Sequence, residues 1–395
     1  SFSDTTKNPA IVLDLEHRDI LLDWDIEVLN SSEISGKRTS KSWADEQHFY
    51  FHMEFSEEFD TNYNKENPTK LFLSFNDLPN NQMMVKVGVS VVSSQNAKEN
   101  LLSEANHWDF DKYLSSSKNQ WNKALSKIDI SSNNDSLKEI FYTALYHTMI
   151  APNLVSDVNG DYRATDMQVH NDSLANYTVF SLWDTFRSTH PLYNLIERKK
   201  TALFLNTFLN QYQFGGQLPI WELCANYTGC MIGYHVVSVI LDAYVKSIDF
   251  ENYPKLYLAM KEISNREKLG IPEYKNKGYI SSFQEPESVS KTLEYAYNDW
   301  CIYKMAQIFN DTSTIDSYVK RAQSYKNIFN LNSGLMQPKT NGNWKSGFIA
   351  SEVNYNYTEA NSWQYSFFVP HDVEGLINIH QGKERFENKL DELFT

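Results

Sequence analysis

The chain has 395 residues, of which 41% are hydrophobic and 22% charged, and its formal net charge is −14. This length and composition are typical of a globular protein of two or three domains, and the scarcity of Gly (14) and Pro (11) excludes collagen-like and Pro/Gly-rich low-complexity chains. The acidic balance argues against a nucleic-acid partner. No apolar run approaches the about 18 residues of a membrane-spanning helix, so we expect no membrane insertion.

Cysteine usage and the N-terminal residues say little about the compartment. Three cysteines (Cys224, Cys230 and Cys301) are too few for a disulfide framework and lack the spacing of a zinc site. The first ten residues, SFSDTTKNPA, lack the apolar core of a signal peptide. Aromatic residues are dense (24 Tyr, 23 Phe and 9 Trp), which is typical of sugar-binding surfaces but equally of ordinary core filling.

Residues 1–95 are predicted to form strands, because apolar and polar residues alternate along several short runs. These runs are 11–17, 48–55, 71–75 and 83–93. Within the last run, alternate valines should line one face: Val85, Val87, Val89 and Val91. Several strands with no helix between them favour an antiparallel sandwich, of which 1–95 would be part.

The pattern becomes helical after residue 95. We interpret 96–130 as a helical linker that packs on both neighbours, and 131–395 as a helical domain. Its predicted helices are 136–151, 182–196, 198–212, 229–247, 253–264, 289–309 and 313–329. Helices 229–247 and 289–309 are apolar nearly all round, whereas 253–264 and 313–329 have one apolar stripe. Buried and half-exposed helices in alternation predict an inner and an outer ring, which is an α/α toroid.

Two segments place a tryptophan directly before a carboxylate. Trp183 and Asp184 lie at a predicted helix start, and Trp221 and Glu222 precede the most apolar helix. One interpretation is an aromatic wall beside a carboxylate that binds sugar hydroxyls. The alternatives are helix capping for Asp184 and a buried ion pair for Glu222.

Two further segments are rich in carboxylates. Glu294 and Asp299 lie on a mostly apolar helix, where bracing of neighbouring helices is the simpler interpretation. The segment YTEANSWQYSFFVPHDVEGL (357–376) gathers polar residues among aromatic ones and favours a functional site: Glu359, Asn361, Trp363, Gln364, His371, Asp372 and Glu374. The motifs of serine hydrolases, P-loop proteins, zinc proteases and dinucleotide-binding folds find no match.

These segments resemble glycoside hydrolase family 92 (GH92), exo-acting α-mannosidases best known from gut bacteria that degrade N-glycans. The resemblance covers roughly residues 70–395 and is carried by FSLWDTFRSTHPLYNLI, LPIWELCANYTGCMIGYHVVSVILDAYVKSIDF, SVSKTLEYAYNDWCI and YTEANSWQYSFFVPHDVEGLINI. It implies an α+β multidomain fold: a β-sandwich, a helical linker and an (α/α)6 toroid. It also implies calcium-dependent, inverting release of terminal α-linked mannose, and a periplasmic, secreted or cell-surface location.

The resemblance implies roles for particular residues. Glu359 matches the position expected for the general acid, with Glu374 as second choice. Trp183 and Asp184 match the wall and hydroxyl clamp of a mannose pocket. Trp221 and Glu222 match a second wall and clamp.

The family pattern extends further than this sequence at both ends. We therefore expect an incomplete toroid, with the general base and the metal ligands outside residues 1–395, so that these residues alone do not turn over α-mannosides. Two alternatives stay open: a related toroidal glycosidase or glycoside phosphorylase of other specificity, and a catalytically inactive mannose-binding protein.

Overall fold

The computed structural model describes residues 9–63, 67–76 and 78–395. Most of the SFSDTTKNPA segment, residues 1–8, therefore lies outside the described part. The chain divides into two compact units, Ser1–Phe180 with Glu222–Thr228, and Ser181–Trp221 with Gly229–Thr395. The boundaries of the sandwich, linker and helical domain drawn from the sequence remain predictions.

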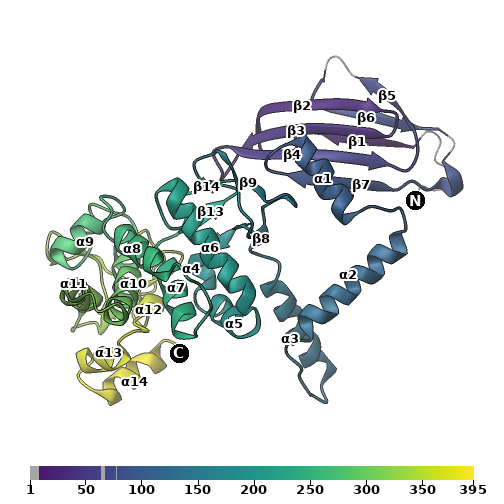
Figure 1. Cartoon of the computed structure of the whole chain (residues 1–395). Helices are drawn as coiled ribbons and strands as arrows, with labels where there is room; N and C mark the ends of the chain where they lie inside the picture. Colours follow the sequence, from purple (N-terminus) through teal and green to yellow (C-terminus); the bar gives the residue numbers. More distant parts are fainter. Residues whose placement is uncertain (1–8, 64–66, 77) are drawn as a thin grey trace. The chain divides into compact units, whose positions relative to one another are not determined.

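The two larger antiparallel sheets lie in the first unit, where the alternating runs predicted strands (Figure 1). The four-stranded sheet has the order β2-β3-β4-β7, with β2 Ile20–Asn30, β3 Glu33–Lys41, β4 Gln47–Phe55 and β7 Val85–Ser90. The three-stranded sheet has the order β1-β6-β5, with β1 Ala10–Asp14, β5 Phe59–Tyr63 and β6 Lys70–Phe75. Both sheets contribute to one apolar core: Leu15, Ile26, Ile34, Phe51, Phe55, Phe59, Leu71, Leu73 and Phe75.

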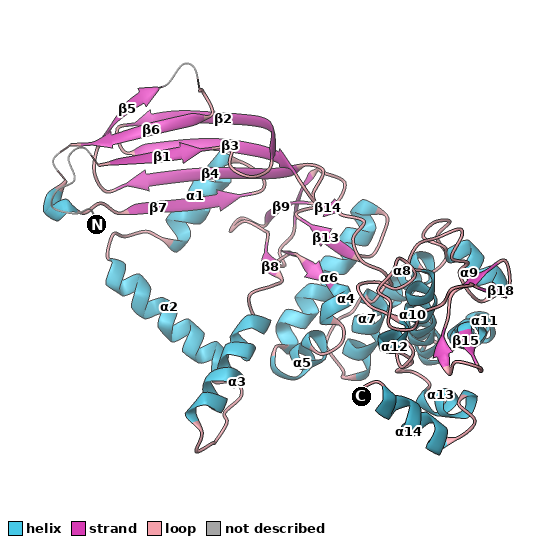
Figure 2. Ribbon diagram, turned by 180° about the vertical axis from the view of Figure 1, so that it is seen from behind, coloured by secondary structure: helices cyan, strands magenta, loops and turns pink. Residues whose placement is uncertain are grey.

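Helix α1 (Ser94–Glu104) packs across β7 and β4 (Figure 2). It lies so close that a Cβ atom at Gly88 would be 2.1 Å from the carbonyl oxygen of Ala97. Gly88 is therefore buried, while Val87 and Val89 on the opposite face are 51% and 47% exposed. The alternation predicted for this strand is present, but its valine face is the more open one.

Helices and short strands complete the first unit. Asp109 and Asn134 are the N-cap residues of α2 (Phe110–Leu125) and α3 (Asp135–Thr148). Each side chain accepts a hydrogen bond from a backbone N–H group in the first turn, as short polar residues at helix starts commonly do. The remaining elements are η1 Pro79–Asn81, β8 Asn153–Leu154, β9 Asp161–Arg163, β10 Val169–Asn171, β11 Tyr177–Thr178 and β14 Asn226–Tyr227. The division between the two units falls within β13 Trp221–Leu223, after Trp221.

The second unit is helical. Its helices are α4 Leu182–Thr185, α5 Thr189–Ile196, α6 Arg198–Gly215, α7 Val236–Val245, α8 Tyr253–Ile263, α9 Ile271–Lys277, α10 Ser288–Ile308, α11 Thr312–Ala322, η2 Ser324–Ile328, α12 Ser362–Tyr365, α13 Val373–Ile379 and α14 Lys383–Glu392. The short strands are β12 Phe180–Ser181, β15 Phe329–Asn330, β16 Leu335–Met336, β17 Lys339–Thr340 and β18 Asn343–Trp344. A β-rich part followed by a helical part agrees with the predicted fold class.

Burial of the helices follows the predicted alternation. In α7 and α10 most residues are buried, seven of ten and fifteen of twenty-one. In α8 and α11 the buried residues, six and three of eleven, lie along one stripe. The order of burial is thus confirmed, and the closed toroid remains a prediction.

The predicted helix 313–329 ends at Ala322 and is followed by the 3₁₀ helix η2, and two further predicted helices are shorter than their apolar patterns. The run 229–247 becomes helical only at Val236, because Gly229, Met231 and Gly233 have positive φ angles of 68°, 61° and 77°. The run 182–196 is divided between α4 and α5, with Ser188 outside the helical region at φ −146°. Among the described residues, no helix combines the length and apolar character that a membrane crossing requires.

Candidate functional site

Ser181 joins the two tryptophan–carboxylate segments within the second unit. The indole Nε1 of Trp221 donates to the hydroxyl of Ser181 at 2.9 Å. That hydroxyl in turn donates to the Asp184 carboxylate. Trp221 is partly exposed and Asp184 is exposed, so an indole edge and a carboxylate held by one serine are both open to a ligand.

The orientation of the Trp183 side chain is fixed by a buried carboxylate, that of Glu294. Its indole Nε1 donates to Oε1 of Glu294 at 3.2 Å. Glu294 lies on α10 and has no exposed surface. A carboxylate removed from water needs compensating donors, and the indole is one of them.

The Tyr365 hydroxyl donates to Glu294, and the Arg187 guanidinium forms an ion pair with it. The Tyr365 hydroxyl lies 3.4 Å from Oε1 of Glu294, and an Arg187 guanidinium nitrogen lies 3.6 Å from the same atom. Burial, and then the Glu294 charge, raise the pKa of Tyr365, which keeps this hydroxyl protonated and able to donate. The guanidinium also lies over the Trp183 ring, 5.6 Å from its centroid.

The second oxygen of Glu294 faces a histidine whose tautomer is set by its neighbours. The Tyr234 N–H donates to Oδ1 of Asn298 at 2.8 Å, so the amide nitrogen of Asn298 faces Nδ1 of His235, 3.0 Å away. Nδ1 then accepts, and the His235 proton is on Nε2, which lies 2.8 Å from Oε2 of Glu294. Glu294 therefore acts as an acceptor that positions other groups, which agrees with the bracing role inferred from the sequence.

Glu359 lies in a loop whose neighbouring residues are buried. The Thr358 N–H donates to the hydroxyl of Ser290 at 2.9 Å, and the Tyr357 hydroxyl donates to the carbonyl of Met336 at 2.9 Å. Glu359 itself is exposed and has a φ of 50°. A left-handed backbone costs a non-glycine residue about 1–2 kcal/mol, and such strain concentrates at functional positions.

Helix α10 brings the two groups of residues together. Ser290, which holds the Glu359 loop, and Glu294, which holds Trp183, are four residues apart and therefore share one face of the helix. Trp183, Asp184, Trp221 and the Glu359 loop thus belong to one connected set within the second unit. Their convergence on one cavity remains a prediction.

Glu222 belongs to the first unit and is 3% exposed. The Thr178 hydroxyl donates to Oε2 of Glu222 at 3.0 Å and accepts from the Cys224 N–H at 2.8 Å. Burial raises the pKa of Glu222 to about 7, although hydrogen bonds led by that of Thr178 act in the opposite direction. Use of Glu222 as a hydroxyl clamp therefore requires its carboxyl to become accessible, and this role remains a prediction.

Asp372 and Glu374 lie at the start of α13. Asp372 caps this helix by accepting from the Gly375 N–H at 2.9 Å, and it also accepts from the Tyr325 hydroxyl at 2.7 Å. Burial raises the pKa of Asp372, but these hydrogen bonds and one from Gln323 outweigh it and lower the pKa. Glu374 is exposed in the first turn of α13, where a negative charge interacts favourably with the helix dipole. Both carboxylates thus have local structural explanations.

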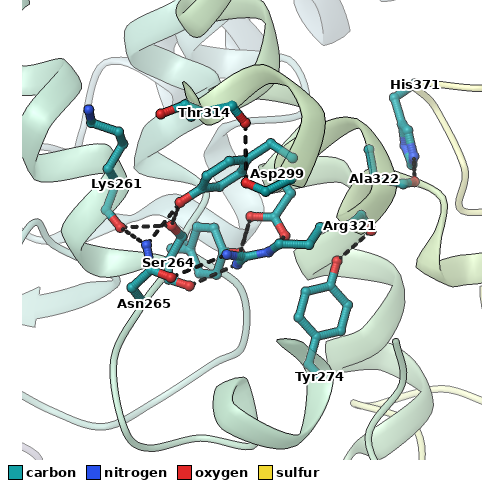
Figure 3. A network of polar contacts seen from close by, with 12 residues as sticks. Lys261, Ser264, Asn265, Tyr274, Asp299, Thr314, Arg321, Ala322 and His371 are labelled. Atoms are coloured by element: carbon teal, nitrogen blue, oxygen red, sulfur yellow. Dashed lines mark hydrogen bonds and ion pairs between the residues drawn. The ribbon is translucent and has the colours of Figure 1, made fainter. Parts of the chain in front are cut away.

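Asp299 forms a separate buried network (Figure 3). Its carboxylate accepts hydrogen bonds from Nε of Arg321 at 2.7 Å and from the Tyr234 hydroxyl at 2.7 Å. A second guanidinium nitrogen of Arg321 donates to the carbonyl of Ser264 at 2.8 Å. The ion pair therefore links α10, α11 and the end of α8.

Sequence reasoning missed four contributors to the site: Ser181, Arg187, His235 and Tyr365. Arg187 and His235 were visible as polar residues inside apolar segments. Their partnership with Glu294 joins residues 107 and 59 positions apart in the chain, which a pattern of local periodicity does not reveal.

The described residues do not fit a resident calcium site. They contain no group of three or more His, Cys, Asp or Glu side chains placed to hold a metal ion. Calcium takes six to eight oxygen ligands, several of them usually carboxylates.

Comparison with known proteins gives consistent matches. The family model described as the glycosyl hydrolase family 92 N-terminal domain matches residues 1–90, and that of the catalytic domain matches residues 96–395. A family GH92 α-mannosidase from Bacteroides thetaiotaomicron, solved alone and with mannoimidazole, is 33% identical with a TM-score of 0.91, over 98% of this chain and 55% of that one. An inverting GH92 mannosidase from the same organism is 28% identical with a TM-score of 0.90, over 99% of this chain and 56% of that one.

One curated relative, from the fungus Arthroderma benhamiae, is described as an uncharacterized secreted glycosidase. It is 26% identical over an alignment of 359 residues, and the match covers 79% of this chain and 42% of the relative. The chain thus spans about half the length of the proteins it matches.

Proposed function

Because the chain belongs to glycosyl hydrolase family 92, we propose that it forms part of an exo-acting α-mannosidase that removes terminal α-linked mannose from N-glycans or other mannosides. The observation that carries this proposal is the connected set in the second unit. It joins two tryptophans, one exposed carboxylate and a loop with a second exposed carboxylate through helix α10.

The tryptophans and Asp184 would bind the terminal sugar. The C–H faces of mannose stack on indole rings, and Trp183 and Trp221 each have their N–H engaged by the protein, which fixes the ring orientation. Asp184 is acceptor-only when ionised and can accept from sugar hydroxyls while it also accepts from Ser181. Groups held in place before the substrate binds lose less entropy on binding.

Glu359 would act as the general acid. Protonated, it would donate to the glycosidic oxygen as the bond to the mannose C1 breaks, and its exposed position leaves room for the departing alcohol. In an inverting reaction, a second carboxylate about 6.5–9.5 Å away takes a proton from the attacking water. We assign that base to no residue of this chain.

The proposal also includes a calcium requirement and a location outside the cytoplasm. We propose that turnover depends on calcium, as the family resemblance implies. The description of the fungal relative as secreted supports action outside the cytoplasm, in the periplasm, at the cell surface or in the medium.

The test is an activity screen of the longer polypeptide on α-1,2-, α-1,3-, α-1,4- and α-1,6-mannobiose, with and without EDTA. The proposal expects mannose release that EDTA abolishes, with β-mannose as the first anomer seen by proton NMR. Turnover that requires inorganic phosphate would instead indicate a phosphorylase. Mannose binding with no release from any linkage would indicate an inactive binding protein.

A further inference from the structure

A cavity of about 480 Å³ in the second unit lies beside the segment that leads to Glu359. Its lining includes Ser282, Phe283, Glu285, Thr340, Lys345 and Tyr355, and we name it the Phe283 pocket. None of these residues belongs to the set around Trp183 and Glu294.

Two aromatic rings stand open at the Phe283 pocket. Phe283 is 81% exposed and Tyr355 is 58% exposed. An aromatic ring left in water gains free energy when an apolar surface covers it. Sugars offer such a surface in their C–H faces, and they offer hydroxyl groups beside it.

The backbone and side chains around these rings are held in place. The Ser282 N–H donates to the carbonyl of Lys339 at 2.8 Å, which fixes the residue next to Phe283. The ammonium of Lys345 lies 4.3 Å from the centre of the Tyr355 ring and donates to its hydroxyl at 2.5 Å. The Tyr355 ring and the backbone next to Phe283 are therefore held in place before a ligand arrives, and we call the two rings the platform of the pocket.

The polar groups of the Phe283 pocket favour a neutral ligand with hydroxyl groups. The charge of Glu285 is already paired with Lys291, whose Nζ lies 2.6 Å from its Oε1. The hydroxyls of Ser282 and Thr340 lie 2.8 Å apart and each can both donate and accept. The Glu285 carboxylate is paired, the Lys345 ammonium is engaged by the Tyr355 hydroxyl, and the two hydroxyls beside them suit a sugar better than a charged peptide.

The chain connects this platform directly to Glu359. The Glu287 N–H donates to the carbonyl of Tyr355 at 2.5 Å, and the Val289 N–H donates to that of Asn356 at 3.1 Å. These bonds hold the segment before Glu359 along the first turn of α10. The next residue of the helix, Ser290, accepts from the Thr358 N–H through its hydroxyl. The Phe283 pocket and Glu359 thus lie at the same end of α10.

We propose that the Phe283 pocket binds a sugar residue of the glycan on the leaving-group side of the cleaved bond. The proposal rests on the proposed function, because a general acid protonates the leaving oxygen and so stands on the side where the rest of the glycan lies. The enzyme would then favour oligosaccharides over simple mannosides.

The test compares Phe283→Ala with Phe394→Ala in the longer polypeptide. Phe394 is a matched control, because its side chain is 80% exposed and lies outside the pocket. For each variant, kcat/KM is measured on a high-mannose oligosaccharide and on an aryl α-mannoside. The expected result is a loss of about threefold to tenfold for Phe283→Ala on the oligosaccharide alone, the range of one aromatic stacking contact. Phe394→Ala should change neither value.

Equal losses of kcat/KM on both substrates, or no loss on the oligosaccharide, would overturn the proposal that the Phe283 pocket binds a sugar residue. If the wild-type protein hydrolyses neither substrate, the proposed function fails and the pocket is judged by calorimetric titration with the same oligosaccharide. Weaker binding by Phe283→Ala than by Phe394→Ala then supports a sugar site, and equal binding rejects it.

Discussion

The indole Nε1 of Trp183 donates to the fully buried carboxylate of Glu294 at 3.2 Å. The half-buried Trp183 wall of the proposed mannose pocket is thereby anchored in the interior of the second unit. The same carboxylate faces His235, Arg187 and Tyr365, so the orientation of the wall depends on one acceptor with several donors.

Replacing Trp183 with Phe should separate the wall from its anchor. The variant keeps an aromatic face but removes one donor from buried Glu294, which should lower the free energy of unfolding by about 1–3 kcal/mol. The phenyl ring has no N–H to hold its orientation, so it can turn. The substitution should therefore also raise KM for an aryl α-mannoside more than it lowers kcat. Denaturant unfolding and steady-state kinetics measure both effects. Trp363→Phe, at a partly buried tryptophan that packs against Lys389, is the control. Equal effects of the two substitutions would contradict the anchoring role of Glu294.

The Asp299–Arg321 pair should matter for stability alone. Arg321→Met leaves the Asp299 carboxylate buried with its strongest partner removed, and breaking a buried ion pair typically costs about 3–5 kcal/mol. We expect a large fall in Tm, with kcat/KM unchanged per folded molecule at a temperature where the variant remains folded. A loss of kcat/KM in folded protein would show that this network also serves the site.

Glu222 should make stability depend on pH. Its pKa is raised from 4.5 to about 7 in the folded state, so the native protein binds more protons than the unfolded chain between those values and loses stability as pH rises. The cost is absent below the unfolded pKa and complete above the folded one, on the order of 3 kcal/mol at about 1.4 kcal/mol per pKa unit. Glu222→Gln should therefore stabilise the protein at pH 8 and have little effect at pH 4.5.

Denaturant unfolding at both pH values measures this difference, with the exposed Glu104→Gln as the control. A stabilisation by Glu222→Gln that is the same at both pH values would show that burial does not raise this pKa.

The sequence predicted the elements better than their contacts. Alternation identified the strand that contains Gly88, but only packing shows that a helix approaches within contact of that glycine and leaves Val87 and Val89 open. The apolar run 229–247 was predicted as one helix because hydrophobicity does not register the positive φ angles at Met231 and Gly233.

The candidate site was similarly visible in part. Tryptophan–carboxylate pairs stand out in a sequence, so Trp183, Asp184 and Trp221 were predicted as candidates. The contacts of Ser181 were not, because a serine two residues before such a pair has no distinctive pattern. Glu294 was noticed, but its partners come from distant segments, and only the fold brings His235 and Tyr365 to it.

The general-acid role of Glu359 is the central claim, and the leaving-group dependence of Glu359→Gln tests it most directly. The amide is nearly isosteric and cannot donate the required proton. On a natural oligomannoside, whose departing alcohol needs protonation, kcat/KM should fall by about 10²–10⁴-fold. On an aryl mannoside with an acidic phenol the fall should be much smaller, with Tm unchanged. An equal fall on both substrates would contradict the assignment and turn attention to Glu374.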